Sequence, residues 1–323
     1  MPRKRQLNIE QEQYRCRGAF INLKQMLDQR HVAKNLELDY HSRTRIGMAG
    51  THISKIKGRG VDFEEFRAYQ PGDDIRSIDW RVTARVGRPF TKVFREERER
   101  PVIIGVDQSR SMFFGSQVAF KSVVAAETAA IICWTTVDNG DRVGGVVFGD
   151  SGQELVKPRR SKRSALRFLN ALSEYNQELV RSHKQIPAAT EGNYLLNALQ
   201  QMYRITKPGS NVYLISDFVN FDSECARLVQ QLALHNSMTC VLIYDGLEEN
   251  LPRPGVYGIT DGQSRSTIDT FTRSAREHYH EDFDQRIKTL TDTLSKIQVH
   301  LIKVRTNEVV MDQLETWKQQ KTH

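Results

Sequence analysis

The sequence predicts a doubly wound α/β domain with a mostly parallel sheet over residues 101–323. Two short apolar runs, Val102–Asp107 and Asn211–Asp217, each end in a carboxylate. Such a continuous apolar run is typical of a strand that a parallel sheet buries on both faces. Stretches with helical periodicity lie between the runs, and strands that alternate with helices favour this architecture. Because ligands bind at the carboxyl ends of parallel strands, we expect Asp107 and Asp217 to meet at one edge of the sheet.

The remaining elements of this domain follow from apolar periodicity and from turn residues. Two strand-like runs, residues 142–148 and 153–156, flank the turn 149–152 and predict a β-hairpin. Further strands are predicted over residues 238–244 and 299–304. Helices are predicted over residues 117–137, 161–175, 194–205, 223–235, 270–296 and 308–319.

The first 100 residues differ in character from the rest, so we expect three parts in the chain. Residues 1–57 are predicted to be an N-terminal helical and basic segment. A small β-rich unit is predicted over residues 58–100, because aromatic and β-branched residues alternate there with tight turns. The α/β domain then occupies residues 101–323.

Two features organise the N-terminal segment. Phe20, Leu23 and Leu27 have the spacing of an amphipathic helix within residues 8–40. The basic, glycine-containing stretch 41–60 is predicted to be a loop.

The positive charge of the chain is concentrated at its beginning. Residues 1–100 hold 22 Lys and Arg against 14 Asp and Glu, whereas the other 223 residues hold 25 of each. A basic segment favours an acidic partner, which is a protein surface, a nucleic acid or an anionic lipid. A basic surface that is merely solvated is equally compatible with this pattern.

Cysteine usage and hydropathy predict a soluble, cytoplasmic protein. None of the four cysteines belongs to a C-x-x-C pair, which argues against a thiolate zinc site and suits a reducing compartment. No apolar run follows the basic N-terminus, so we expect no signal peptide. The most apolar stretch, Val118–Val137, is interrupted by Lys121 and Glu127 and predicts a buried helix rather than a membrane span.

The sharpest functional signal is the segment Asp107-Gln-Ser109-Arg-Ser111, which follows the first apolar strand. Alternate positions of an extended loop point the same way, so one carboxylate and two hydroxyls can face a common point. Hard oxygen ligands of this kind suit Mg²⁺ or Mn²⁺, and Asp217 is a candidate direct or water-mediated ligand. The alternative is that Ser109 or Ser111 only caps the following helix.

This D-x-S-x-S segment resembles the metal-ion-dependent adhesion site of von Willebrand A domains. The resemblance implies a third ligand, a threonine in a loop before a helix, and a final aspartate after a later strand. Asp217 matches the aspartate. The threonine position falls on Asn193, which departs from the pattern but still offers an amide oxygen. The resemblance further implies that the metal keeps one coordination position open for a partner's Asp or Glu.

A denser pattern spans residues 58–112. It comprises Gly58-Arg-Gly60, Phe63, Arg67-Ala-Tyr69, Pro71-Gly-Asp-Asp74, Arg76, Ile78-Asp-Trp80, Ala84-Arg85 and Asp107-x-Ser-x-Ser-Met112. This pattern resembles the domain of unknown function 58 family, which are von Willebrand A-like proteins associated with MoxR-type AAA+ ATPases. The resemblance implies a chaperone-like or assembly role, with a MoxR-type AAA+ ATPase and an unknown client protein as partners. Many members carry transmembrane helices, and we expect none in this chain.

The charged residues of the small unit allow two interpretations. They are Asp73, Asp74, Arg76, Asp79, Arg81 and Arg85. These side chains form either a docking surface for the ATPase or an internal ion-pair network that holds the small unit on the α/β domain. Phe63 and Trp80 favour the second interpretation, because large aromatic side chains suggest a packed segment.

We expect a binding protein rather than an enzyme. The sequence contains no G-x-x-x-x-G-K-[ST] loop, no G-x-S-x-G elbow and no H-E-x-x-H pair. His278 and His280 lie on a predicted helix, where a solvated polar face is favoured over metal binding. The alternative function is salt-dependent nucleic-acid binding through residues 41–60 and 157–163. Neither run contains aromatic residues for base stacking, so nucleic acid is the less favoured partner.

Overall fold

The computed structural model describes residues 12–34, 61–70, 75–96, 100–182, 193–260 and 265–321. The chain divides into two compact units, one formed by residues 1–44 together with 100–323 and the other by residues 45–99. The predicted basic loop 41–60 lies outside the described residues.

The larger unit is built on one mixed sheet, which has six strands within the described residues. All neighbouring pairs are parallel except the pair at one edge, which is the predicted hairpin. In spatial order the strands are β10 (His300–Arg305), β7 (Ser237–Tyr244), β6 (Asn211–Ser216), β3 (Val102–Asp107), β4 (Val143–Gly149) and β5 (Gly152–Arg159). The predicted α/β architecture with a mostly parallel sheet is therefore confirmed.

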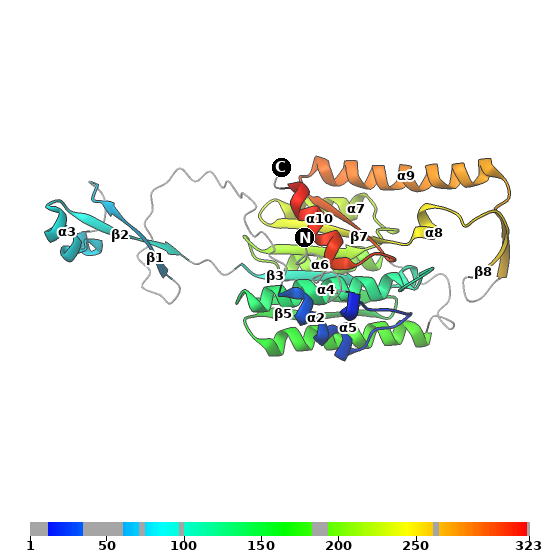
Figure 1. Cartoon of the computed structure of the whole chain (residues 1–323), viewed down its shortest axis with the longest axis horizontal. Coiled ribbons are helices and arrows are strands. Elements are labelled where there is room, and N and C mark those ends of the chain that lie inside the picture. The colour runs from blue at the N-terminus through cyan, green and yellow to red at the C-terminus, as the bar shows by residue number, and fades with distance from the viewer. Residues whose placement is uncertain are drawn as a thin grey trace. The chain divides into compact units, whose positions relative to one another are not determined.

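Helices cover both faces of the sheet, as a doubly wound fold requires (Figure 1). One face packs against α4 (Lys121–Asp138), α5 (Lys162–Ser182) and α10 (Val310–Lys321), with α2 (Leu23–Ala33) lying on α4. The other face packs against α6 (Tyr194–Ile205), α7 (Ser223–Ala233) and α9 (Arg273–Lys296). Each helix overlaps a predicted one, with ends that differ by a few residues in most cases.

Strand β3 is the centre of the sheet, and its sequence explains why. All six of its residues are buried, and Ile103 packs on the opposite face from Ile104 because side chains alternate along a strand. Its neighbour β4 approaches closely at Gly145, where an added Cβ would lie 1.9 Å from the Ile104 carbonyl oxygen. Only glycine fits that position without moving the strands apart.

The chain reverses its direction of winding around β3. After β3 it continues to β4 on one side, and it later returns to β6 on the other side. This is a topological switch point, where the loops after neighbouring strands diverge and leave room for a ligand. The carboxyl ends of β3 and β6 are therefore the expected place for a binding site.

The N-terminal helix is shorter than the predicted stretch but is firmly attached to the larger unit. Asn22 caps α2 by accepting a hydrogen bond from the Gln25 amide, and the Trp134 indole donates to the Met26 carbonyl at 2.9 Å. Ile21 and Met26 are fully buried, whereas Phe20 is 55% exposed. The predicted apolar face included Phe20, but Phe20 precedes the helix, which is capped by Asn22. Its neighbour Ile21 is the residue that is buried there.

The smaller unit contains a two-stranded antiparallel ribbon, formed by β1 (Val61–Ala68) and β2 (Phe90–Glu96). Between the strands lie a short 3-10 turn, η1 (Ile75–Ser77), and a helix that was not predicted, α3 (Trp80–Val86). Asp79 caps α3 by accepting from the Arg81 amide at 2.9 Å. Trp80 is 66% exposed, so it is not packed within the smaller unit itself, because it occupies the first turn of α3.

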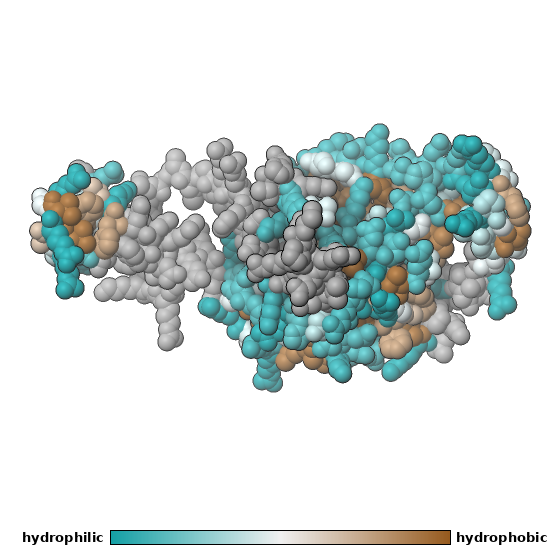
Figure 2. Space-filling view, in the orientation of Figure 1, coloured by the Kyte–Doolittle hydropathy of each residue, from teal (hydrophilic) through white to brown (hydrophobic). Residues whose placement is uncertain are grey.

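A second unpredicted ribbon lies between β7 and α9, in the segment where Pro252 and Pro254 predict a loop. It consists of β8 (Val256–Thr260) and β9 (Arg265–Asp269), which pair in antiparallel register. Val256 is largely exposed, and apolar side chains gather at this end of the larger unit (Figure 2). The alternation of apolar and polar residues in β8 is too short to distinguish from loop in the sequence.

Within the described ranges, no helix is both long enough and apolar enough to span a membrane. The two charges that interrupt the apolar stretch of α4, Lys121 and Glu127, are both buried in the folded unit. Each is therefore a structural feature of α4 that needs a partner.

Glu127 faces the N-terminal segment. Its Oε2 accepts a hydrogen bond from the Cys16 amide at 3.2 Å. Burial raises the pKa of the Glu127 carboxyl from its ordinary value of 4.5 to about 8. The folded state consequently holds a proton on Glu127 at pH values where the unfolded chain has released it.

This raised pKa predicts the pH dependence of stability. Folding is favoured by the protonated form of Glu127, so its contribution is complete below pH 4.5 and is lost as the pH rises toward 8. Each unit of pKa difference corresponds to about 1.4 kcal/mol. We therefore expect Glu127→Gln to be more stable than the wild type at pH 8 by roughly 2 kcal/mol or more, and nearly equal at pH 4. Urea unfolding at both pH values measures the difference, and two parallel pH profiles would contradict the assignment.

Candidate metal centre at the carboxyl edge of the sheet

Asp107 is the last residue of β3, and the structure buries its carboxylate, leaving 5% of the residue exposed. The Ser109 amide donates to Oδ1 at 2.8 Å, and the Ser216 hydroxyl donates to Oδ2 at 2.6 Å. Ser216 is the last residue of β6, so the carboxyl ends of the two neighbouring strands are joined by this hydrogen bond. The predicted meeting of these two strand ends is thus observed.

The two predicted serine ligands lie close to each other. The hydroxyl oxygens of Ser109 and Ser111 are 3.2 Å apart in the turn that leads into η2 (Arg110–Met112). The Ser109 side chain makes no capping hydrogen bond to η2, and α4 begins only at Lys121. The alternative interpretation, in which this serine only caps a helix, is therefore wrong for Ser109.

The loop that carries the serines is held from both sides. Gln108 donates through Nε2 to the Ser122 carbonyl at 3.0 Å and accepts from the Asn176 amide group at 2.9 Å. The Arg110 amide donates to Asp150 Oδ2 at 2.6 Å. Alternate residues of the segment are thus anchored, while Ser109 and Ser111 keep their hydroxyls near each other.

Asp217 follows β6 and is also buried. Its Oδ1 accepts from the Val219 amide at 3.2 Å. The intervening residue, Phe218, has φ of 55°, which is the left-handed region that non-glycine residues seldom adopt. The Phe218 amide donates to the Ser216 hydroxyl at 3.0 Å, so one serine side chain serves both this turn and Asp107.

A buried lysine that the sequence-based site did not include completes the centre. Lys121 begins α4 and is 1% exposed, and its Nζ donates to Asp217 Oδ2 at 2.8 Å and to Glu248 Oε1 at 2.7 Å. Burial alone would lower the pKa of the Lys121 ammonium, but the two carboxylates outweigh burial and raise it. Glu248 belongs to the short helix α8 (Gly246–Glu249) after β7, where its Oε2 accepts from the Asp245 amide at 2.9 Å.

The two aspartates of the centre therefore have opposite surroundings. Asp217 is paired with the Lys121 ammonium, whereas the hydrogen-bond donors on Asp107 are an amide and a hydroxyl, both neutral. Burial and the nearby negative charge of Asp217 raise the pKa of Asp107 from 3.8 to about 6, although its hydrogen bonds act in the opposite direction. A cation beside Asp107 would relieve this unfavourable burial of negative charge.

Asn193 occupies a different local role from the one that the resemblance implies. Its Oδ1 accepts from the Leu196 amide at 3.0 Å and caps α6, and its Nδ2 donates to Asp222 Oδ2 at 2.8 Å. These bonds tie α6 to the turn before α7. Metal coordination by the Asn193 oxygen would have to compete with the capping bond. Thr190 lies outside the described residues.

The fit of a divalent cation can be judged from these donors. The described residues contain no group of three or more His, Cys, Asp or Glu side chains that could hold a metal, so a cation here would depend on hydroxyl and water ligands. One carboxylate, two adjacent hydroxyls and a nearby second carboxylate suit Mg²⁺ or Mn²⁺, which retain waters and prefer oxygen. His278 and His280 lie on α9, and the side chain of His278 is largely exposed, as predicted.

The ion pair of Lys121 generates a stability prediction. Lys121→Met leaves Asp217 and Glu248 as unpaired carboxylates, and breaking a buried ion pair typically costs about 3–5 kcal/mol. We expect a loss of that order in the free energy of unfolding, measured by chemical denaturation. Lys157→Met, at an exposed position, is the matched control and should change stability by less than about 0.5 kcal/mol. An unchanged midpoint for Lys121→Met would exclude the ion pair.

Comparison with known proteins shows the family of the chain. The family described as protein of unknown function DUF58 matches residues 65–288, which is more than half of the chain. Uncharacterised proteins from Mycobacterium bovis and Mycobacterium tuberculosis are 26% identical to it over 254 residues, covering 76% of this chain and 77% of the relatives.

Three solved structures are similar in part. BatB, a conserved hypothetical protein from Bacteroides thetaiotaomicron, is 17% identical with a TM-score of 0.40 and covers 69% of this chain and 98% of its own. An aerotolerance-related membrane protein from Bacteroides fragilis is 16% identical with a TM-score of 0.37, covering 69% and 100%. A von Willebrand factor type A protein from Catenulispora acidiphila is 20% identical with a TM-score of 0.30, covering 48% and 35%. From the extent of the family match, we conclude that the chain belongs to the DUF58 family of proteins of unknown function.

Proposed function

We propose that the chain is a non-enzymatic protein-interaction module that binds Mg²⁺ or Mn²⁺ at Asp107 and uses the ion to capture a carboxylate of a client protein. The observation that carries the proposal is the buried Asp107 carboxylate, whose donors are neutral and which lies beside the adjacent hydroxyls of Ser109 and Ser111. A divalent ion would supply the missing positive charge and keep a coordination position for the partner.

The residues of the centre would have distinct roles. Asp107, Ser109 and Ser111 would coordinate the ion directly. Asp217 is held by Lys121, so it would act through a water molecule while keeping its ion pair. Asn193 is the remaining candidate ligand, and it would have to release the Leu196 amide to coordinate.

The proposed partners follow from the family resemblance. They are a MoxR-type AAA+ ATPase and a client protein, and the role is that of an adaptor in protein assembly or maturation in the cytoplasm. A metal-bridged carboxylate contact suits an adaptor, because binding requires no chemical step and is reversible when the ion or the partner leaves.

A second candidate function is nucleic-acid binding by the smaller unit. Its described part exposes five arginines together with Trp80, and arginine and tryptophan can contact phosphates and stack on bases. The arginines are Arg67, Arg76, Arg81, Arg85 and Arg88. A gel shift with single-stranded and double-stranded DNA or RNA at about 50 and 200 mM salt separates the two functions, since phosphate contacts weaken steeply over that range. If the smaller unit binds nucleic acid, a complex forms at the lower salt and weakens at the higher salt, whereas no complex at either salt rejects this second function.

The metal proposal is tested by calorimetric titration of Mg²⁺ and Mn²⁺ into the purified chain. We expect saturable binding by the wild type and a loss of at least about tenfold in affinity for Asp107→Ala, because one anionic ligand is removed. Asp292→Ala, at an exposed position of α9, is the matched control and should bind as the wild type does. Equal affinities of wild type and Asp107→Ala, or an absence of binding to both, would reject the site.

A further inference from the structure

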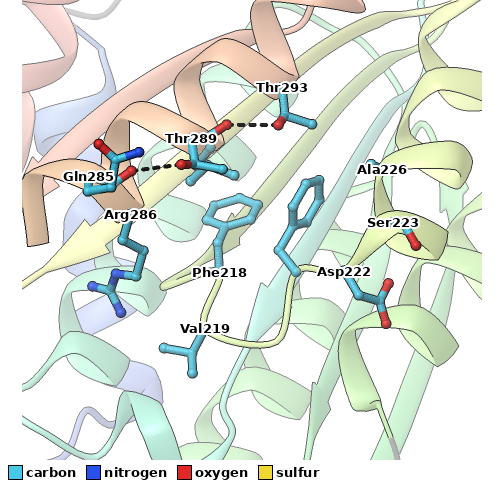
Figure 3. A pocket seen from close by; sticks show the side chains of 11 residues that line it. Phe218, Val219, Asp222, Ser223, Ala226, Gln285, Arg286, Thr289 and Thr293 are labelled. Carbon is cyan, nitrogen blue, oxygen red and sulfur yellow. Dashed lines mark hydrogen bonds between the residues drawn. The ribbon is translucent and has the colours of Figure 1, made fainter. Parts of the chain in front are cut away.

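A groove lies beside the candidate metal centre, between the turn that follows β6 and helix α9 (Figure 3). Its volume is about 580 Å³, within the size range of protein ligand sites. It is lined by the turn after β6, by the beginning of α7 and by one side of α9, and its lining residues include Phe218, Val219, Phe221, Asp222, Arg286 and Leu290.

The floor of the groove is apolar. The rings of Phe218 and Phe221 pack edge to face, with centroids 5.7 Å apart, and Leu290 is buried beneath α9. Two threonines of α9 line the groove, but their hydroxyls are satisfied within the helix: Thr289 donates to the Gln285 carbonyl and Thr293 to the Thr289 carbonyl (Figure 3). The surface that remains for an occupant is therefore largely hydrocarbon.

The rim of the groove carries one positive charge that is available to a partner. Within the described residues, no carboxylate lies at salt-bridge distance from Arg286, whose guanidinium carbon is 5.5 Å from the Phe283 ring centroid. Asp222, on the opposite rim, is already engaged, because it accepts from the Cys225 amide and from the Asn193 side chain. An apolar floor with an unpaired arginine at its rim complements an apolar side chain that has an acidic neighbour.

The groove and the candidate metal centre share one short turn of chain. Phe218 and Val219 directly follow Asp217, and the Val219 amide donates to its carboxylate. The Phe218 backbone is held by the Ser216 hydroxyl, which also donates to Asp107. Val219 is 50% exposed at the mouth of the groove. The groove and the Asp107 carboxylate are therefore linked through Ser216 and the turn that follows it.

We propose that the groove binds an acidic, apolar segment of the client protein, with its apolar side chains on Phe218 and Phe221 and a carboxylate on Arg286. This inference rests on the proposed function for the identity of the occupant, but groove binding itself requires no metal. The aromatic floor can accept apolar side chains of a peptide, and Arg286 at the rim can bind a neighbouring carboxylate of the same peptide. A second copy of this chain is an alternative occupant that the test distinguishes.

The experiment uses three fluorescein-labelled hexapeptides and the full chain in the presence of EDTA, with fluorescence anisotropy as the readout. The peptides are Glu-Leu-Glu-Phe-Glu-Leu, Glu-Ser-Glu-Ser-Glu-Ser and Lys-Leu-Lys-Phe-Lys-Leu. We expect the first peptide to bind at least about tenfold more tightly than the other two. Only this peptide offers both apolar side chains to the floor of the groove and carboxylates to Arg286 at its rim. Equal binding of the serine peptide or of the lysine peptide would overturn the proposal.

Matched variants locate the binding. Arg286→Glu and Val219→Asp should each weaken binding of the first peptide at least about tenfold, and both positions are exposed enough to preserve the fold. Two control variants should change binding less than about twofold. Lys288→Glu lies two residues along α9, on a different side of the helix, and Leu234→Asp lies at the far end of α7. Equal effects of Arg286→Glu and Lys288→Glu would overturn the proposal, as would concentration-dependent self-association that the peptide does not displace.

Measuring peptide binding first in EDTA and then with added Mg²⁺ separates the test of the groove from the test of the proposed function. Peptide binding in EDTA by both wild type and Asp107→Ala supports the groove, whatever the metal does. A further gain on adding Mg²⁺ that Asp107→Ala abolishes would support the metal function. Groove binding without that gain would leave the groove standing and reject the metal-assisted capture.

Discussion

The ion pair between the buried Lys121 ammonium and the carboxylates of Asp217 and Glu248 is the interaction on which the carboxyl edge of the sheet depends. It joins the start of α4 to the turn after β6 and to the short helix α8 after β7, two segments that follow paired neighbouring strands of the sheet. Because a buried charge is tolerated only with a partner, the positions of these three elements are mutually determined. The Asp107 turn lies against this fixed frame.

The contrast between Asp107 and Asp217 shows that one edge of the sheet holds two buried carboxylates in opposite electrostatic surroundings. Asp217 has a permanent cation in the Lys121 side chain, and its charge contributes to structure. Asp107 is held by Ser109 and Ser216 in a defined orientation without a charge that compensates its own. The first arrangement stabilises the fold, whereas the second leaves the buried charge of Asp107 uncompensated, which is the basis of the metal site that we propose.

Much of this could be predicted from the sequence, because it depends on local pattern. The apolar runs before Asp107 and Asp217 identified the central strands, and topology alone then placed their ends together. The roles of Lys121 and Asn193 could not be predicted in the same way. Lys121 was visible as a charge in an apolar helix, but its partners lie about 100 residues or more away along the chain.

Sequence spacing put Asn193 at the threonine position that the resemblance implies. Its amide group is instead engaged by the Leu196 amide and the Asp222 carboxylate, contacts that spacing cannot reveal. Trp80 shows the same limit in the smaller unit, since composition suggested packing and the helix position exposed it. Sequence patterns thus located the strand ends reliably, while the side-chain partners depended on contacts between distant segments.

The left-handed conformation of Phe218 has a thermodynamic consequence. It is maintained by the Ser216 hydroxyl, and the same hydroxyl orients Asp107, so the backbone of the turn and the orientation of the carboxylate are linked variables. Any ligand that shifts one of them must change the free energy of the other, and linkage makes that effect equal in both directions. A ligand bound on one side of Ser216 would therefore be felt on the other side through one hydroxyl group, which accepts from Phe218 and donates to Asp107, without movement of a domain.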